Sequence, residues 1–182
     1  MRFPLFALVL ASVSALGCSD DTPSPPKAFV YAQIGPGVDK DVNDSTRCKL
    51  TTEEWLSLGK PEAGVESGTM QSESQVTTSC SVVPEADGFR VAASASLERR
   101  GSFTVSGFFK ASGEQPKIRG SFTRGDTGTF RQDDCTVTYE GQQGVAAGRV
   151  WGKISCPKAS FQGGQDRTCL GTAEFKFETC DQ

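Results

Sequence analysis

Short segments in which hydrophobic and polar residues alternate run through the chain from about residue 28 to its end. In the clearest one, Phe89, Val91 and Leu97 share a face with two alanines, while mostly polar residues occupy the other face. Alternation of this kind predicts a β-strand with one buried side and one side in water. Similar segments lie at 29–34, 76–82, 102–110, 117–123, 129–139, 148–156 and 171–179.

Turns that contain glycine separate these segments. Residues 84–88 form one such turn, so residues 74–98 are predicted to be a β-hairpin. Roughly seven to nine short strands in a single domain are typical of an antiparallel sandwich or barrel. We therefore expect an all-β domain over residues 28–182, an antiparallel β-sandwich with a barrel as the alternative.

One short helix is expected at residues 52–58. Thr51 and Glu54 have the spacing of a capping box, and Gly59 would end the helix. Because two helical turns are too short to be stable alone, we expect Trp55 to pack against the sheet.

The N-terminus has the pattern of an export signal. A basic end is followed by the apolar residues 3–16, a stretch shorter than the roughly 20 residues that a membrane-spanning helix needs. The stretch closes on Ala15-Leu16-Gly17-Cys18, with small residues at Ala15 and Gly17 that suit a signal peptidase. We predict that residues 1–17 are a signal peptide and that cleavage occurs before Cys18.

This segment resembles the signal of bacterial lipoproteins, although Ala15 stands where that family usually has leucine. The resemblance implies that Cys18 carries diacylglycerol and fatty-acid chains such as palmitate, which anchor the protein in a membrane. Ser19 after the cysteine is similar to outer-membrane sorting in that family. The proline-rich residues 18–27 would then be a lipid-attached, non-helical tether. Ordinary secretion, with Cys18 as a free thiol, is the alternative.

Cysteine parity supports the lipid on Cys18. The chain has seven cysteines, and an odd number in an exported protein needs an explanation. If Cys18 is acylated, six remain to form three disulfides in an oxidising compartment: Cys48, Cys80, Cys135, Cys156, Cys169 and Cys180. Cys169 and Cys180 should not pair with each other, because a strand between them would hold them ~30 Å apart.

Six cysteines allow fifteen connectivities, and strand registers favour some of them. The set that we favour joins Cys48 with Cys80, Cys135 with Cys180, and Cys156 with Cys169. The bond between Cys156 and Cys169 implies an antiparallel register of the last two strands in which Val150 lies opposite Phe175. A rival register pairs Cys135 with Cys156 and places Val137 opposite Ile154.

Composition removes several classes of chemistry. With 19 Lys and Arg against 22 Asp and Glu, and no long basic run, we expect no nucleic-acid partner. The absence of histidine excludes histidine bases and imidazole metal sites. The acidic residues 39–43 copy the first ligands of an EF-hand loop but lack its later glycine and glutamate, so we predict a solvated loop. We expect no metal, no cofactor and no catalytic residues.

Arg149, Trp151 and Lys153 form the candidate binding site. Alternation places Trp151 between two cations, on the face opposite Val150 and Ile154. Flat aromatic rings on a sheet stack on sugars or anchor protein partners. Alternatively, the helix or a loop covers this face and Trp151 belongs to the core.

These patterns together predict a lipid-anchored cell-envelope protein that is not an enzyme. Lipid on Cys18 would attach the protein to the membrane. Its domain would serve binding or structural support, with a protein or a carbohydrate as the ligand. One alternative is a histidine-free hydrolase that uses paired carboxylates among Asp133, Asp134, Glu174 and Glu178. The other is a freely secreted, disulfide-rich inhibitor or effector.

Overall fold

Antiparallel strands build the part of the protein that the structure describes. The computed structural model describes residues 24–37, 48–50, 53–164 and 167–182, with residues 53–55 as backbone only. Within these ranges the chain is all-β and contains no helix. The strands are β1 (Lys27–Gly35), β2 (Glu53–Leu58), β3 (Val65–Glu66), β4 (Met70–Gln71), β5 (Ser74–Glu85), β6 (Gly88–Leu97), β7 (Gly101–Lys110), β8 (Gln115–Arg124), β9 (Gly128–Thr138), β10 (Gly144–Ala146), β11 (Arg149–Phe161) and β12 (Thr168–Glu178).

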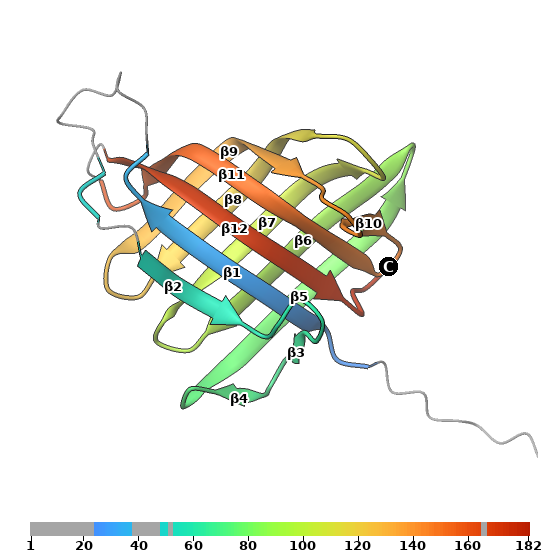
Figure 1. Ribbon diagram of the computed structural model, residues 1–182, viewed down its shortest axis with the longest axis horizontal. Coiled ribbons are helices and arrows are strands. Elements are labelled where there is room, and N and C mark those ends of the chain that lie inside the picture. Colours follow the sequence, from blue (N-terminus) through green and yellow to red (C-terminus); the bar gives the residue numbers. More distant parts are fainter. Residues whose placement is uncertain (1–23, 38–47, 51–52, 165–166) are drawn as a thin grey trace, which may run out of the picture.

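The strands form a nearly closed barrel rather than a sandwich (Figure 1). Ten of them follow one path, in the order β2-β1-β12-β11-β9-β8-β7-β6-β5-β4, while β10 pairs with β11 and β3 with β1. In Figure 1, β1, β12 and β11 cross the front of the molecule and β6, β7 and β8 lie behind them. The all-β prediction is confirmed, and the barrel alternative describes the architecture.

The alternating strands were predicted correctly because one face of each is buried in the barrel. In the β5–β6 hairpin, Val76 lies opposite Leu97 and Val82 opposite Val91, and all four side chains are buried. The interior is filled by large side chains that are almost fully buried, among them Phe103, Phe109, Phe122, Phe130, Phe175 and Phe177. This packed core makes the outer wall the place to look for a ligand site.

The predicted helix is wrong, because residues 53–58 form strand β2. In β2, Leu56 and Leu58 are fully buried on either side of the exposed Ser57, which is the two-residue period of a strand. Pairing with β1 sets Leu56 opposite Ala32 and satisfies the backbone of both strands. A capping box contributes only about 1 kcal/mol and cannot compete with this burial. Thr51 and the Trp55 side chain lie outside the described residues.

The barrel closes along β5, whose open edge is covered by other parts of the chain. Near its start, Val76 donates a backbone hydrogen bond to Thr69 O (2.9 Å). Near its middle, Val82 N donates to Asp181 O (2.8 Å) and Asp181 N donates to Cys80 O (3.0 Å). The disulfide between Cys80 and Cys180 lies at the same place. The C-terminal tail therefore completes the barrel wall.

A side chain joins the other edge strand to β4. Gln71 donates through Nε2 to Ser57 O of β2 (2.7 Å) and accepts through Oε1 from Gly59 N (3.3 Å). The Gln71 amide thus makes the pair of hydrogen bonds that a neighbouring backbone would make in a continuous sheet. We call these two hydrogen bonds the Gln71 clasp; they hold β2 beside β4 without strand pairing.

Three disulfides are confirmed, but the pairing that we favoured is wrong. The bridges join Cys48 with Cys169, Cys80 with Cys180, and Cys135 with Cys156. As expected, Cys169 and Cys180 do not pair with each other.

The cause is the register of β11 against β12. Val150 lies opposite Phe177, two residues beyond Phe175, and a bulge after Cys156 leaves Ala159 opposite Cys169. The rival register is correct on the other side of β11, where Ile154 lies opposite Val137 and Cys135 bonds to Cys156.

Candidate functional site

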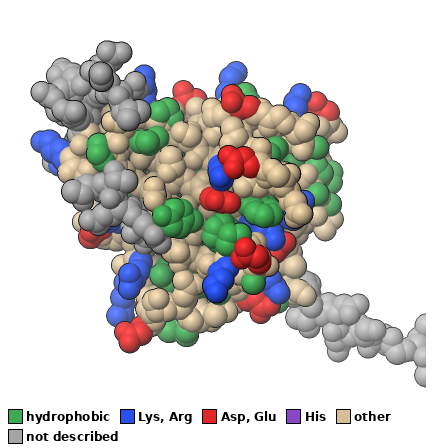
Figure 2. Space-filling view, in the orientation of Figure 1, with side chains coloured by type: hydrophobic (Ala, Val, Ile, Leu, Met, Phe, Trp, Pro, Cys, Tyr) green, Lys and Arg blue, Asp and Glu red, His purple; other side chains and the backbone are tan. Residues whose placement is uncertain are grey.

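The outer wall formed by β1, β12, β11 and β9 carries the candidate site. Strand registers bring polar side chains from four separate segments into rows that cross the strands. One row runs from Tyr31 through Glu174 and Lys153 to Thr138. Figure 2 shows hydrophobic and charged side chains gathered near the middle of this face, next to a broad area of other side chains and backbone.

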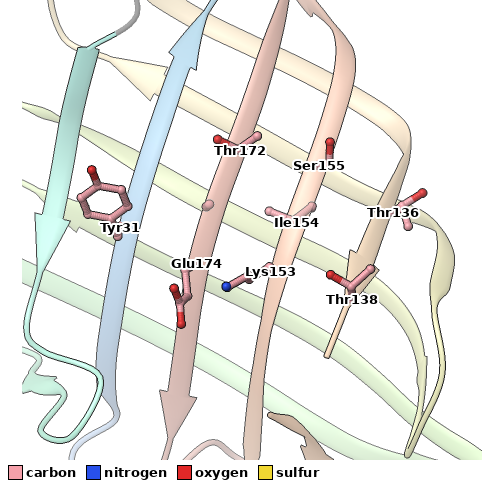
Figure 3. Close-up of a pocket in the computed structure, with 9 residues that line it drawn as sticks. Tyr31, Thr136, Thr138, Lys153, Ile154, Ser155, Thr172 and Glu174 are labelled. Atoms are coloured by element: carbon pink, nitrogen blue, oxygen red, sulfur yellow. The ribbon is translucent and has the colours of Figure 1, made fainter. Parts of the chain in front are cut away.

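A second row of small hydroxyl side chains leaves a groove beside the first. Thr172 lies opposite Ser155, which lies opposite Thr136, and Figure 3 shows the three together. The groove has a volume of about 350 Å³. Its lining residues are Tyr31, Thr136, Thr138, Lys153, Ile154, Ser155, Thr172, Ala173 and Glu174. Because serine and threonine are short, the row forms a depression bordered by the longer side chains of the first row.

Tyr31 supplies the aromatic surface at one end of this groove. Its side chain is 38% exposed, although it stands on a strand whose other face is buried. Gln33 Nε2 donates a hydrogen bond to the Tyr31 hydroxyl (2.9 Å) and so fixes the direction of the ring. The ring is available for contact with a ligand at little further cost in side-chain entropy.

Charged groups border the groove and are held in place by the turn at residues 140–143. Lys153 Nζ lies 2.6 Å from Glu140 Oε2, and this hydrogen bond raises the pKa of the lysine. Gln143 Nε2 donates to Glu174 Oε1 (3.2 Å). The groove is thus bordered by a fixed cation and a carboxylate that are already partnered.

Of the three residues predicted to bind a ligand, only Lys153 lines the groove. Trp151 stands on the outer face as predicted, but it is half-buried, and the Lys176 ammonium lies 5.0 Å from the centre of its ring. Its Nε1 is buried without a hydrogen-bond partner in the described part of the chain. Arg149 lies opposite Glu178, two positions further from the groove. Trp151 is therefore not an open stacking platform.

Sequence reasoning missed most of the groove. The residues Thr136, Val137 and Thr138 alternate, which was signal enough to place both threonines on the outer face. Nothing in the sequence showed that Tyr31, from the first strand, would share a row with Glu174, near the end of the chain. That neighbourhood depends on the pairing of β1 with β12.

The carboxylates considered for hydrolysis are engaged in pairs with other side chains. Asp133 Oδ1 lies 2.7 Å from Arg119 Nε and 2.9 Å from Arg131 Nε, and hydrogen bonds from the two arginines lower its pKa. A carboxyl group held ionised is a poor proton donor for glycoside cleavage. Glu178 lies 3.0 Å from Lys176, and Asp134 accepts a hydrogen bond from Gln132.

Other sequence expectations concern metals and the N-terminus. The described residues contain no group of three or more acidic or cysteine side chains that could hold a metal ion. The acidic residues 39–43, the signal peptide and Cys18 lie outside those residues. The described part of the chain also contains no helix that is long and apolar enough to span a membrane.

No protein-family model matches this chain, and no curated protein or solved structure matches it. Any assignment of function therefore rests on the chemistry of the barrel wall.

Proposed function

We propose that this chain is an exported, lipid-anchored cell-envelope protein whose barrel binds a carbohydrate, without catalysis, on the wall formed by β1, β12, β11 and β9. The groove beside Tyr31 is the observation that carries the proposal. Its volume lies within the range of small-ligand sites, and its hydroxyls can both donate and accept hydrogen bonds.

A sugar matches the groove better than an apolar ligand does. The C–H face of a sugar ring packs against an aromatic ring, and Tyr31 offers such a ring at the end of the groove. The hydroxyl row and the partnered charges of Lys153 and Glu174 match the alternating donors and acceptors of sugar hydroxyls. All of these groups stand on rigid strands, so little order has to be imposed when a ligand binds.

The disulfides and the start of the barrel support export and anchoring. Three bridges are consistent with an exported protein and account for six of the seven cysteines, all except Cys18. Pro25 O accepts a hydrogen bond from the Thr179 hydroxyl (2.8 Å), and Pro26 O accepts one from Ser67 N (3.1 Å). From Cys18 to Ser24, the tether then reaches at most about 23 Å. The barrel would sit close to the membrane surface.

Binding to glycans tests the function of the groove. The mature chain with Cys18→Ser is titrated with soluble fragments of cell-wall glycan and of outer-membrane polysaccharide, and affinity is measured by calorimetry. Tyr31→Ala should weaken binding about tenfold, because the stacking surface is lost. Met70→Ala, which removes another exposed hydrophobic side chain on β4, should leave affinity unchanged. Absence of glycan binding, or equal binding by Tyr31→Ala, would refute the proposal.

Intact mass tests the anchor. Chain extracted from membranes should begin at Cys18 and be heavier than its sequence by a diacylglycerol and fatty-acid chains. Cys18→Ser should move the protein into the soluble fraction. An unmodified mature chain in the medium would contradict anchoring and favour the secreted alternative.

A further inference from the structure

A second hollow lies on the opposite wall of the barrel, over β6, β7 and β8. These strands stand behind β1 and β12 in Figure 1, so this hollow opens away from the groove beside Tyr31. Its volume is about 330 Å³. The rim carries Arg90, Lys117 and Arg119, and the floor is formed by Ala92, Ser106 and Gly107. Small, uncharged residues at the base and cations around the edge distinguish it from the groove.

Local breaks in the sheet create this hollow. Pairing between β7 and β8 ends where Ser106 lies opposite Arg119, and β8 is irregular on both sides of Ile118. Lys117 stands at this irregularity with φ 62°, the left-handed region that residues with a Cβ rarely occupy. A backbone conformation of this kind is energetically costly for a residue with a Cβ, and such conformations are concentrated at ligand sites. Here it projects a cation from the rim.

The rim carries an excess of positive charge. Arg119 is paired with Asp133, which also borders the hollow, at 2.7 Å. Arg90 makes two hydrogen bonds to Glu85, at 2.7 and 2.8 Å, and Glu85 does not line the hollow. Lys117 is exposed and makes no ion pair with the residues that the structure describes. Three cations therefore face one carboxylate around a neutral floor.

We propose that this hollow binds a phosphoryl group through Lys117, Arg119 and Arg90. Guanidinium groups bind tetrahedral oxyanions through two parallel hydrogen bonds, and a lysine adds a mobile point charge. The floor of alanine, serine and glycine leaves room for the anion between the three side chains. Asp133 holds Arg119 while the hollow is empty and would compete with the ligand for it. The site is independent of the groove and of its proposed sugar ligand.

Titration with inorganic phosphate at low ionic strength tests the site. Amide chemical shifts of the Cys18→Ser chain are followed, and those of Ser106, Gly107 and Arg119 should move together. Lys117→Asn keeps a residue that accepts the left-handed backbone but removes the charge, and should weaken binding about fivefold to tenfold. Asp133→Asn should tighten binding several-fold, because it frees Arg119. Lys60→Asn, at an exposed lysine outside the hollow, is the matched control and should have no effect.

The source of the phosphoryl group is distinguished by vesicles. Vesicles of phosphatidylglycerol are compared with vesicles of phosphatidylcholine, using the same variants. Binding that depends on Lys117 supports the site in either case, with free phosphate indicating a soluble ligand and anionic vesicles a lipid headgroup. Equal binding by the Lys117→Asn and Lys60→Asn variants, or weaker binding by Asp133→Asn, would overturn the proposal.

Discussion

Replacing Cys80 and Cys180 together by alanine should open the barrel along β5. This bridge connects the middle of β5 to the C-terminal tail and spans 100 residues of sequence. Closing a loop of that length in the unfolded chain corresponds to about 4.7 kcal/mol of stability. The Cys135–Cys156 bridge spans only 21 residues, for which the same relation gives about 3.3 kcal/mol.

Comparison of the two double variants isolates the effect of loop length. All four cysteines are buried, so each alanine pair also leaves a small cavity of similar kind. Urea denaturation should show that Cys80→Ala with Cys180→Ala loses about 1.4 kcal/mol more than Cys135→Ala with Cys156→Ala. A smaller loss for the longer loop would refute the reasoning.

Hydrogen exchange shows whether the tail leaves the wall. Val82 N–H is protected by Asp181 O, and on that edge of β5 the described strand β4 pairs only with Ser74 and Gln75. Without the disulfide, exchange of the Val82 amide should accelerate far more than that of Val91, which lies within the β5–β6 hairpin. Unchanged protection of Val82 would show that the tail binds β5 without help from the bridge.

Three further predictions concern the clasp, the core and one titrating group. Gln71→Ala removes both hydrogen bonds between β4 and the end of β2, including that to Ser57 O, and should cost about 1–2 kcal/mol in urea denaturation. Gly120→Ala places a Cβ 2.6 Å from Cys156 Sγ and should cost about 1–3 kcal/mol, whereas Ser121→Ala on the outer face should cost little. Burial raises the pKa of Tyr139 to about 12. The Tyr139 contribution to stability is therefore complete below pH 10 and lost as pH rises toward 12, and tyrosinate absorbance should show a transition there that Tyr139→Phe removes.

Strands with one buried and one wet face could be predicted from the sequence because each residue of the pattern reports on its own burial. The segment from Phe89 to Leu97 alternates throughout, and it forms β6 as expected. The helix prediction for residues 52–58 was wrong because the capping pattern of Thr51 and Glu54 reports only on local structure. The strand that pairs with this segment, β1, lies about 25 residues earlier in the sequence. Long-range pairing overruled the local signal.

The candidate site was less predictable than the fold. The outer position of Trp151 followed from alternation, but the ammonium of Lys176 over its ring depends on the β11–β12 register. The register that we predicted differs from the observed one by two residues. An error of two residues leaves every side chain on its correct face of the sheet but changes the residue opposite it on the neighbouring strand. Tyr31 illustrates the same limit, since only the pairing of β1 with β12 brings it beside Thr172.

The pairing of β1 with β12 means that the first and last strands of the domain are neighbours. A chain that emerges from its N-terminal end cannot build this wall until its final residues are released, and such non-local contacts make folding slow. Oxidation in order of emergence would first join Cys48 to Cys80, whose native partners are Cys169 and Cys180. If oxidation follows the order of emergence, thiol exchange must break this early crosslink before the native bridges can form.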